Sequence, residues 1–212
     1  MIIDDQNYDV IIIGTGAGGG TLAHKLAPTG KKILVLEQGD FLEKESSELV
    51  DEQDFEKVQH QDGISPEWEV KYKDFEPYYT EAEKLYQVHG KTGDDLTEPS
   101  RSEDFPFPTV DSEPQVEEIC NRIAKKGLNP AFLPIGVGNQ GRTDSEDTGI
   151  SPTIQSYDNV TLKTKAKVVA LHTNPTGTEV KAVEVKIGEE SYLFMGNIIV
   201  VTCGAINSAA LL

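Results

Sequence analysis

Residues 8–40 contain the feature that most restricts what this chain can fold into, an apolar run followed by a glycine-rich turn and a helical pattern. Val10-Ile11-Ile12-Ile13 is typical of a strand buried on both faces. A helix is predicted from Ala17 to Ala27, because its apolar residues share one face and Pro28 follows it. A second strand is predicted over residues 32–36. This order of elements predicts a parallel βαβ unit.

The turn between the first strand and the helix carries Gly14, Gly16 and Gly19 in G-x-G-x-x-G spacing. In such turns the first glycine allows the sharp bend, the second lets a pyrophosphate approach the backbone, and the third lets the helix pack closely on the strand. Glu37 ends the second strand, where a carboxylate can accept both hydroxyls of an adenosine ribose. It would repel a 2′-phosphate, so the pattern predicts a dinucleotide site that disfavours NADP.

The charge of the chain is strongly negative and unevenly distributed. The formal net charge is −17, and residues 43–159 hold −16 of it. This balance argues against nucleic acid or an anionic membrane surface as a partner. The two cysteines lie far apart in the sequence, and their spacing does not indicate a metal site. No apolar run approaches the length of a membrane span. The N-terminal residues lack the basic region of a secretory signal, so a cytoplasmic location is expected.

The middle of the chain is predicted to be helical or irregular. One helix is expected to begin at Asp74 as its N-cap, with Pro77 in its first turn. A second is expected after Ser112, with Gly127 as its C-terminal cap. Residues 136–158 contain few apolar side chains and are predicted to be irregular, with the glycine-rich stretch 136–141 as loop.

A β pattern returns at residue 160. Four short strands are predicted, with a turn at Gly196 between the last two; they cover residues 167–172, 179–187, 191–195 and 197–202. The expected fold class is therefore α/β, a Rossmann-like FAD/NAD(P)-binding domain with a βαβ start, a β-meander and a final strand. Residues 1–42 and 160–212 would form this discontinuous domain, and residues 43–159 would be an acidic insertion or part of a substrate domain.

Four segments together resemble the glucose–methanol–choline (GMC) oxidoreductases. The first is the glycine motif with its second strand, and the second is the DFEPYYTEAE helix from Asp74 to Glu83. NVTLKTKAKVVALHTN resembles the family's strand that meets the adenine, with Val168 at the matching position. IIVVTCGAINSAALL resembles the family's AAGAINSPQLL strand and turn. The last three segments narrow the resemblance to this family.

The resemblance implies an FAD-dependent enzyme that oxidises a small-molecule alcohol or sugar at a CH–OH group by hydride transfer to the flavin. The implied cofactor-binding residues are Gly14, Thr15, Gly16, Ala17, Gly18, Gly19, Glu37, Gln38, Val168 and Gly204. In the family a histidine from the C-terminal third assists proton removal, and this sequence stops at Leu212. His24, His60, His89 and His172 do not match that histidine, so no catalytic residue is assigned.

Two alternatives stay open. The chain could be a module that binds NAD instead of FAD. It could also be a catalytically inactive FAD- or NAD-binding fragment that needs a complementary polypeptide, because an open sheet with apolar edges tends to associate.

Overall fold

The computed structural model describes residues 1–41, 70–138 and 141–212, and the chain divides into two compact units. Unit 1 comprises Met1–Leu42 and Thr143–Leu212, and unit 2 comprises Glu43–Arg142. Unit 1 contains both ends of the chain.

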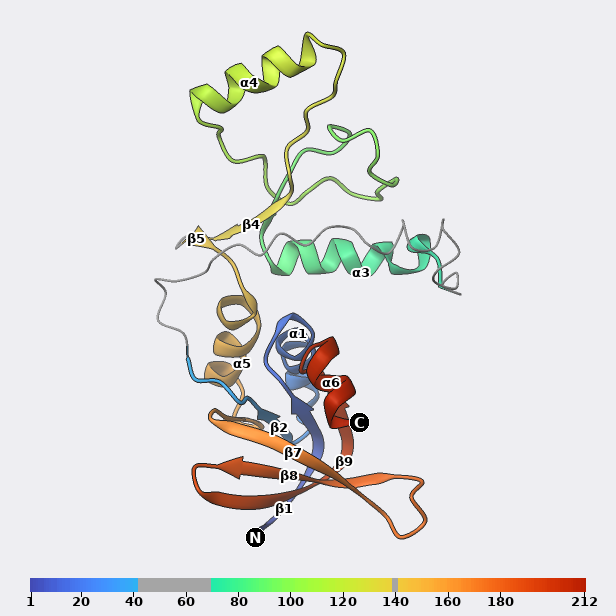
Figure 1. Ribbon diagram of the computed structural model, residues 1–212, viewed down its shortest axis with the longest axis vertical. Helices are drawn as coiled ribbons and strands as arrows, with labels where there is room; N and C mark the ends of the chain where they lie inside the picture. The colour runs from blue at the N-terminus through green and yellow to red at the C-terminus, as the bar shows by residue number, and fades with distance from the viewer. Residues whose placement is uncertain (42–69, 139–140) are drawn as a thin grey trace. The chain divides into compact units, whose positions relative to one another are not determined.

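Unit 1 is built on a six-stranded sheet with the order β6-β2-β1-β9-β8-β7 (Figure 1). The strands are β1 (Ile2–Ile13), β2 (Ile33–Leu36), β6 (Val160–Lys163), β7 (Ala166–Thr173), β8 (Val180–Ile187) and β9 (Glu190–Val201). The first four in the sheet order run parallel, while β8 pairs antiparallel with β7 and β9. Helix α1 (Ala17–Leu26), continued by the short η1 (Ala27–Thr29), makes the β1–β2 crossover. The predicted α/β class and βαβ start are confirmed.

Both faces of the parallel sheet are covered, which explains the unbroken apolar runs in β1 and β2. Val10 and Ile12 of β1 pack with Ala23 of α1 on one face, where Ile33, Val35, Ile150 and Val160 complete the cluster. Ile11 and Ile13 pack on the other face, with Leu34, Leu36, Val183, Val185 and Phe194. Alternate residues of one strand therefore enter two separate cores.

The C-terminal meander contains one strand fewer than the sequence predicts. Residues 190–201 form a single strand, β9, and Gly196 lies buried within it and not in a turn. A Cβ atom at Gly196 would lie 2.8 Å from the Cδ1 atom of Ile11, a fully buried side chain of the neighbouring strand. The glycine is therefore needed for close packing between β9 and β1.

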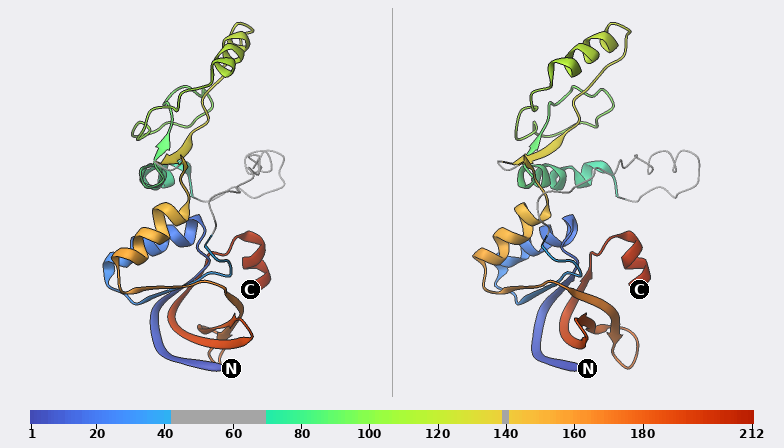
Figure 2. Two further views of the ribbon diagram at one scale, coloured as in Figure 1. Left: turned by 90° about the vertical axis from the view of Figure 1, so that its left-hand side faces the viewer. Right: turned by 60° about the vertical axis from the view of Figure 1, so that its left-hand side comes forward.

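The prediction that residues 136–158 are irregular is wrong, because helix covers much of this range. The π-helical turn η2 (Glu146–Ile150) runs directly into α5 (Ser151–Ser156), and this helix lies beside α1 (Figure 2). The Asp144 carboxylate accepts hydrogen bonds from the N–H groups of Glu146 and Asp147, which caps the helix start. Residues 143–159 consequently group with unit 1, although the sequence pattern placed them in the insertion.

Unit 2 contains α3 (Tyr72–Leu85), β3 (Val88–His89), α4 (Pro114–Ala124), β4 (Ile135–Gly138) and β5 (Gly141–Arg142). The three strands form a small antiparallel sheet, so the glycine-rich stretch after residue 135 is not simply loop. Helix α3 begins one turn earlier than predicted. Asp74 is not its N-cap; it lies in the first turn and accepts a hydrogen bond from the Lys71 N–H at 3.1 Å.

The second helix of unit 2, α4, begins one residue later than predicted. Its N-cap is Glu113 in place of Ser112, and Pro114 occupies the first helical position. The helix ends at Ala124 with Lys125 as its C-cap, so Gly127 is not the cap itself. Gly127 lies two residues further on, where it has a φ of +82° and donates its N–H to the carbonyl of Ala124.

Candidate nucleotide-binding cleft

The glycine turn is shaped by backbone contacts with two neighbouring strands. Gly14 has a φ of +101°, which favours glycine, and its N–H donates to the Leu36 carbonyl at 2.9 Å. On the other side, the Thr202 N–H donates to the carbonyl of Ile13 at 2.9 Å. A Cβ atom on Gly14 would lie 2.8 Å from the Thr202 carbonyl oxygen. The turn therefore requires glycine for both its conformation and its space.

The glycines that follow Gly14 in the turn, Gly16, Gly18 and Gly19, have different surroundings. A Cβ atom on Gly16 would meet no heavy atom within 4 Å, so this side of the turn is open. A Cβ atom on Gly19 would lie 2.0 Å from the Gly14 carbonyl oxygen, where α1 packs against the turn. Gly18 leaves room for ordinary contact with Thr202. These surroundings match the sharp bend, the open approach and the close packing predicted from the spacing.

Helix α1 starts at Ala17, directly after the open glycine. Gly16 is its N-cap, and no side chain caps this end. The first-turn N–H groups of a helix carry partial positive charge and favour an anion. The start of α1 is therefore suited to a phosphate group that approaches over Gly16.

The Glu37 carboxylate accepts three hydrogen bonds, two of them from Thr15 of the glycine turn. Its Oε2 atom accepts from the Thr15 N–H at 2.9 Å and from the Thr15 hydroxyl at 2.8 Å, while Oε1 accepts from the Gly39 N–H at 2.7 Å. Partial burial would raise the pKa of the carboxyl, but the bonds from Gly39 and Thr15 outweigh it and lower the pKa below its ordinary value. Glu37 is consequently ionised at neutral pH.

The start of β7 lies beside the end of β2. The Ala166 N–H donates to the Glu37 carbonyl and the Lys165 N–H donates to the Gly39 carbonyl, each at 2.9 Å. Lys165 has a φ of +53° and its Nζ atom pairs with Asp40. These contacts bring Val168 of β7 near Glu37 although the two are far apart in sequence.

The residues predicted from the motif border one cleft of about 620 Å³. Seven of the ten predicted residues line it: Gly14, Thr15, Gly16, Glu37, Gln38, Val168 and Gly204. Ala17, Gly18 and Gly19 lie on α1 behind the turn and do not line it. The volume is in the range of ligand-binding clefts.

The cleft also has a wall that the sequence analysis did not assign. Thr202, Cys203, Asn207, Ala210 and Leu211 line it, from the end of β9 and from α6 (Ala205–Leu211). The Thr202 hydroxyl donates to the carbonyls of Ile13 and Gly14 at 2.8 and 3.2 Å. The only sequence signal for this wall was the CGAINSAALL segment, of which Gly204 alone was assigned.

The described histidines lie outside the cleft lining. His24 contacts the Thr153 hydroxyl at 3.1 Å between α1 and α5, and His172 pairs with Glu184 across β7 and β8. His89 of unit 2 stacks on Phe107. His60 lies outside the described residues. The arrangement offers binding groups for a nucleotide and does not assign a proton-transfer residue.

The described ranges contain no group of three or more His, Cys, Asp or Glu side chains that could hold a metal ion. Within the same ranges, no helix has both the length and the apolar character that crossing a bilayer requires.

Comparison with known proteins supports the fold. The GDP dissociation inhibitor family model matches residues 4–77, about a third of the chain. A probable sarcosine oxidase of Arabidopsis thaliana is 48% identical over 44 residues, which is 21% of this chain and 11% of that protein.

Among solved structures, pyridoxine 4-oxidase from Mesorbium loti matches with a TM-score of 0.66 and 16% identity. The match covers 95% of this chain and 50% of the oxidase. Formate oxidase of Aspergillus oryzae, whose FAD modification was under study, matches with a TM-score of 0.61 and 14% identity over 98% of this chain and 47% of its own. This chain thus spans about half the length of the solved structures that it resembles.

At identities of 16% and 14%, these likenesses show that the chain shares the fold of the two oxidases. Unit 1 has a Rossmann-like fold, a mostly parallel sheet with a βαβ start.

Proposed function

We infer that this chain is the FAD-binding portion of a GMC-type oxidoreductase that oxidises an alcohol or sugar CH–OH group. The observation that carries the proposal is the convergence of the glycine turn, Glu37 and Val168 on one cleft. FAD, when bound, supplies the hydride acceptor for such an oxidation. The residues of this chain would bind and orient its ADP half.

The start of α1 would hold the pyrophosphate. The space over Gly16 admits an anion close to the backbone, and the uncapped helix end favours its charge. A side chain at this position would project into that space, so the glycine serves access and not the bend.

Glu37 would hold the ribose and Val168 the adenine. Glu37 is ionised and borders the cleft, so its carboxylate can accept hydrogen bonds from ribose hydroxyls. Val168 is partly buried on β7 and offers an apolar side chain and a strand backbone at the same wall. Gln38 and Gly204 also border the cleft.

No substrate is carried over from the relatives, because the names of pyridoxine 4-oxidase, formate oxidase and sarcosine oxidase refer to three different compounds. Whether turnover needs a complementary polypeptide is a separate question from binding.

Calorimetric titration of the purified protein with FAD, ADP and NAD tests the proposal. We expect FAD and ADP to bind, and Glu37→Gln to weaken both by about 1.5–3 kcal/mol through loss of charge-assisted hydrogen bonds. Thr176→Val, in the exposed β7–β8 turn, is the matched control and should bind like the parent. A protein that binds neither FAD nor ADP would overturn the proposal, and a preference for NAD would replace FAD with the alternative ligand.

Alcohol-dependent reduction of a dye by the FAD-loaded protein then separates an active enzyme from an inactive fragment. Turnover by this chain alone would exclude the need for a second polypeptide.

A further inference from the structure

Thr15 occupies the variable position between the first two glycines of the turn, and both of its polar donors point to one carboxylate oxygen. Its N–H and its hydroxyl donate to Glu37 Oε2 at 2.9 and 2.8 Å. Both residues are partly buried and both border the cleft. The backbone N–H of Thr15 is therefore directed at Glu37 and not at the space over Gly16.

This contact joins two parts of the site that lie on different strands. Thr15 follows β1 and belongs to the turn that leads into α1, whereas Glu37 follows β2. The third donor, Gly39, lies on Glu37's own loop and binds the other oxygen. Within the described part of the chain, only the two Thr15 bonds tie the carboxylate to the phosphate-facing turn.

We propose that Thr15 is a positioning residue that fixes the Glu37 carboxylate relative to the glycine turn and so couples the ribose and pyrophosphate subsites. The inference rests on the proposed nucleotide function and gives Thr15 a specific role in it. Thr15 need not touch the ligand. It sets the position of the Glu37 carboxylate, which accepts the ligand's hydrogen bonds. A glutamate held by donors at both oxygens loses less side-chain freedom when a ligand binds.

The hydroxyl can be removed while the N–H remains. Thr15→Val keeps the shape and β-branching of the side chain and deletes one charge-assisted bond to Glu37. We expect it to weaken ADP binding about tenfold. Thr15→Ser, which restores the hydroxyl, should recover most of the affinity. Inorganic pyrophosphate, which has no ribose, should bind both variants equally.

A double-mutant cycle distinguishes positioning from a general structural effect. In a Glu37→Gln background the effect of Thr15→Val on ADP binding should largely disappear, because the charged partner is gone. An undiminished effect in that background, or ADP affinity of Thr15→Val equal to that of the parent, would overturn the proposal.

A measurement without ligand separates this inference from the proposed function. In an NMR titration of the side-chain carboxyl, Thr15→Val should raise the pKa of Glu37 toward its ordinary value, and Thr15→Ser should not. If the parent protein binds no ADP, the nucleotide function fails, yet a raised pKa would still establish the Thr15 contact. An unchanged pKa would refute the contact and with it the positioning role.

Discussion

At Gly19, α1 approaches the glycine turn more closely than any side chain would allow. An added Cβ atom would lie 2.0 Å from a backbone oxygen of Gly14, which cannot move without breaking the turn. We expect Gly19→Ala to lower the free energy of unfolding by about 3 kcal/mol. Gly16→Ala is the matched control, because its Cβ atom meets nothing within 4 Å. It should cost about 1 kcal/mol or less and instead weaken ADP binding. Urea denaturation of both variants tests this. Equal losses in the free energy of unfolding would contradict it.

Glu37 makes stability depend on pH in the acid range. Its pKa in the folded protein is lowered, so the carboxylate binds fewer protons than in the unfolded chain. Its contribution is fully present above the ordinary glutamate pKa of about 4.3, and is lost as the pH falls through the lower folded value. The stability gap between the parent and Glu37→Gln should therefore be constant near neutral pH and shrink below that value. Urea midpoints measured across pH would contradict this if the gap stayed unchanged.

At the scale of elements, the packing of η2 on α1 depends on facing glycines. A Cβ atom on Gly149 would lie 2.9 Å from the backbone carbonyl carbon of Gly20, while Ile150 beside it is fully buried against the sheet. Gly149→Ala should separate the helices and destabilise unit 1 by about 2 kcal/mol. Gln155→Ala, an exposed substitution on the following helix α5, should leave stability nearly unchanged. Thermal unfolding that ranks the two variants equally would refute this account.

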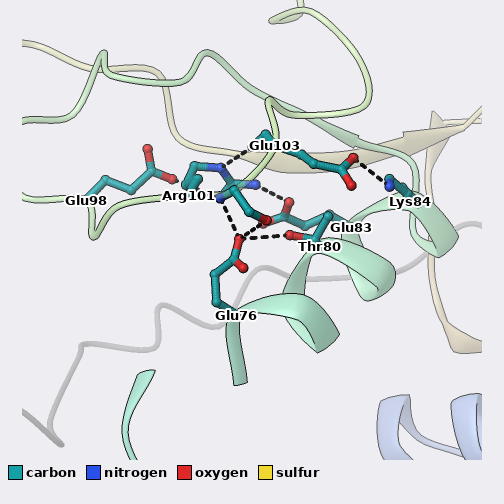
Figure 3. A network of polar contacts seen from close by, with 8 residues as sticks. Glu76, Thr80, Glu83, Lys84, Glu98, Arg101 and Glu103 are labelled. Atoms are coloured by element: carbon teal, nitrogen blue, oxygen red, sulfur yellow. Dashed lines mark hydrogen bonds and ion pairs between the residues drawn. The ribbon is translucent and has the colours of Figure 1, made fainter. Parts of the chain in front are cut away.

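In unit 2, Arg101 connects α3 to the following loop (Figure 3). Its side chain is 8% exposed; it donates to Glu83 and Glu98, and the guanidinium lies 3.8 Å from the Phe105 ring centre. Arg101→Lys should destabilise unit 2 nearly as much as Arg101→Ala, about 3 kcal/mol, because an ammonium cannot reproduce the planar fork. Hydrogen exchange of the α3 amides measures this. Full protection of these amides in Arg101→Lys would show that the positive charge alone is enough to stabilise unit 2.

At the scale of the whole molecule, the described residues that line the candidate cleft all belong to unit 1. Loss of structure in unit 2 should therefore leave nucleotide binding intact. We expect Arg101→Ala to bind ADP within about twofold of the parent, since a difference that small is below about 0.5 kcal/mol. Titration calorimetry together with hydrogen exchange on one sample checks both statements. A large loss of ADP affinity would mean that unit 2 contributes to the site.

How much of the fold and of the candidate site could be predicted depended on how far apart in the sequence the interacting residues lie. The β1–α1–β2 unit was predicted closely, because its strand runs, glycines and Glu37 act within about thirty residues. The η2–α5 helix was missed, because its few apolar residues gave no period and its stability comes from contact with α1. Gly196 was assigned to a turn because only the neighbouring Ile11 side chain reveals its role in a strand. The Thr202–Leu211 wall of the cleft was missed for the same reason.

The sequence alone determined a glycine turn with the spacing of dinucleotide-binding motifs and its carboxylate partner. Backbone conformation at Gly14 and charge at Glu37 are local properties. Tertiary structure decided which residues share the cleft. Parallel pairing of β1 with β2 and β9 brings Thr15, Glu37 and Thr202 together from positions far apart in the chain. The Thr15–Glu37 bonds exist only because that register aligns the ends of two strands. Contacts of this kind are fixed by how the sheet is assembled, which no local pattern records.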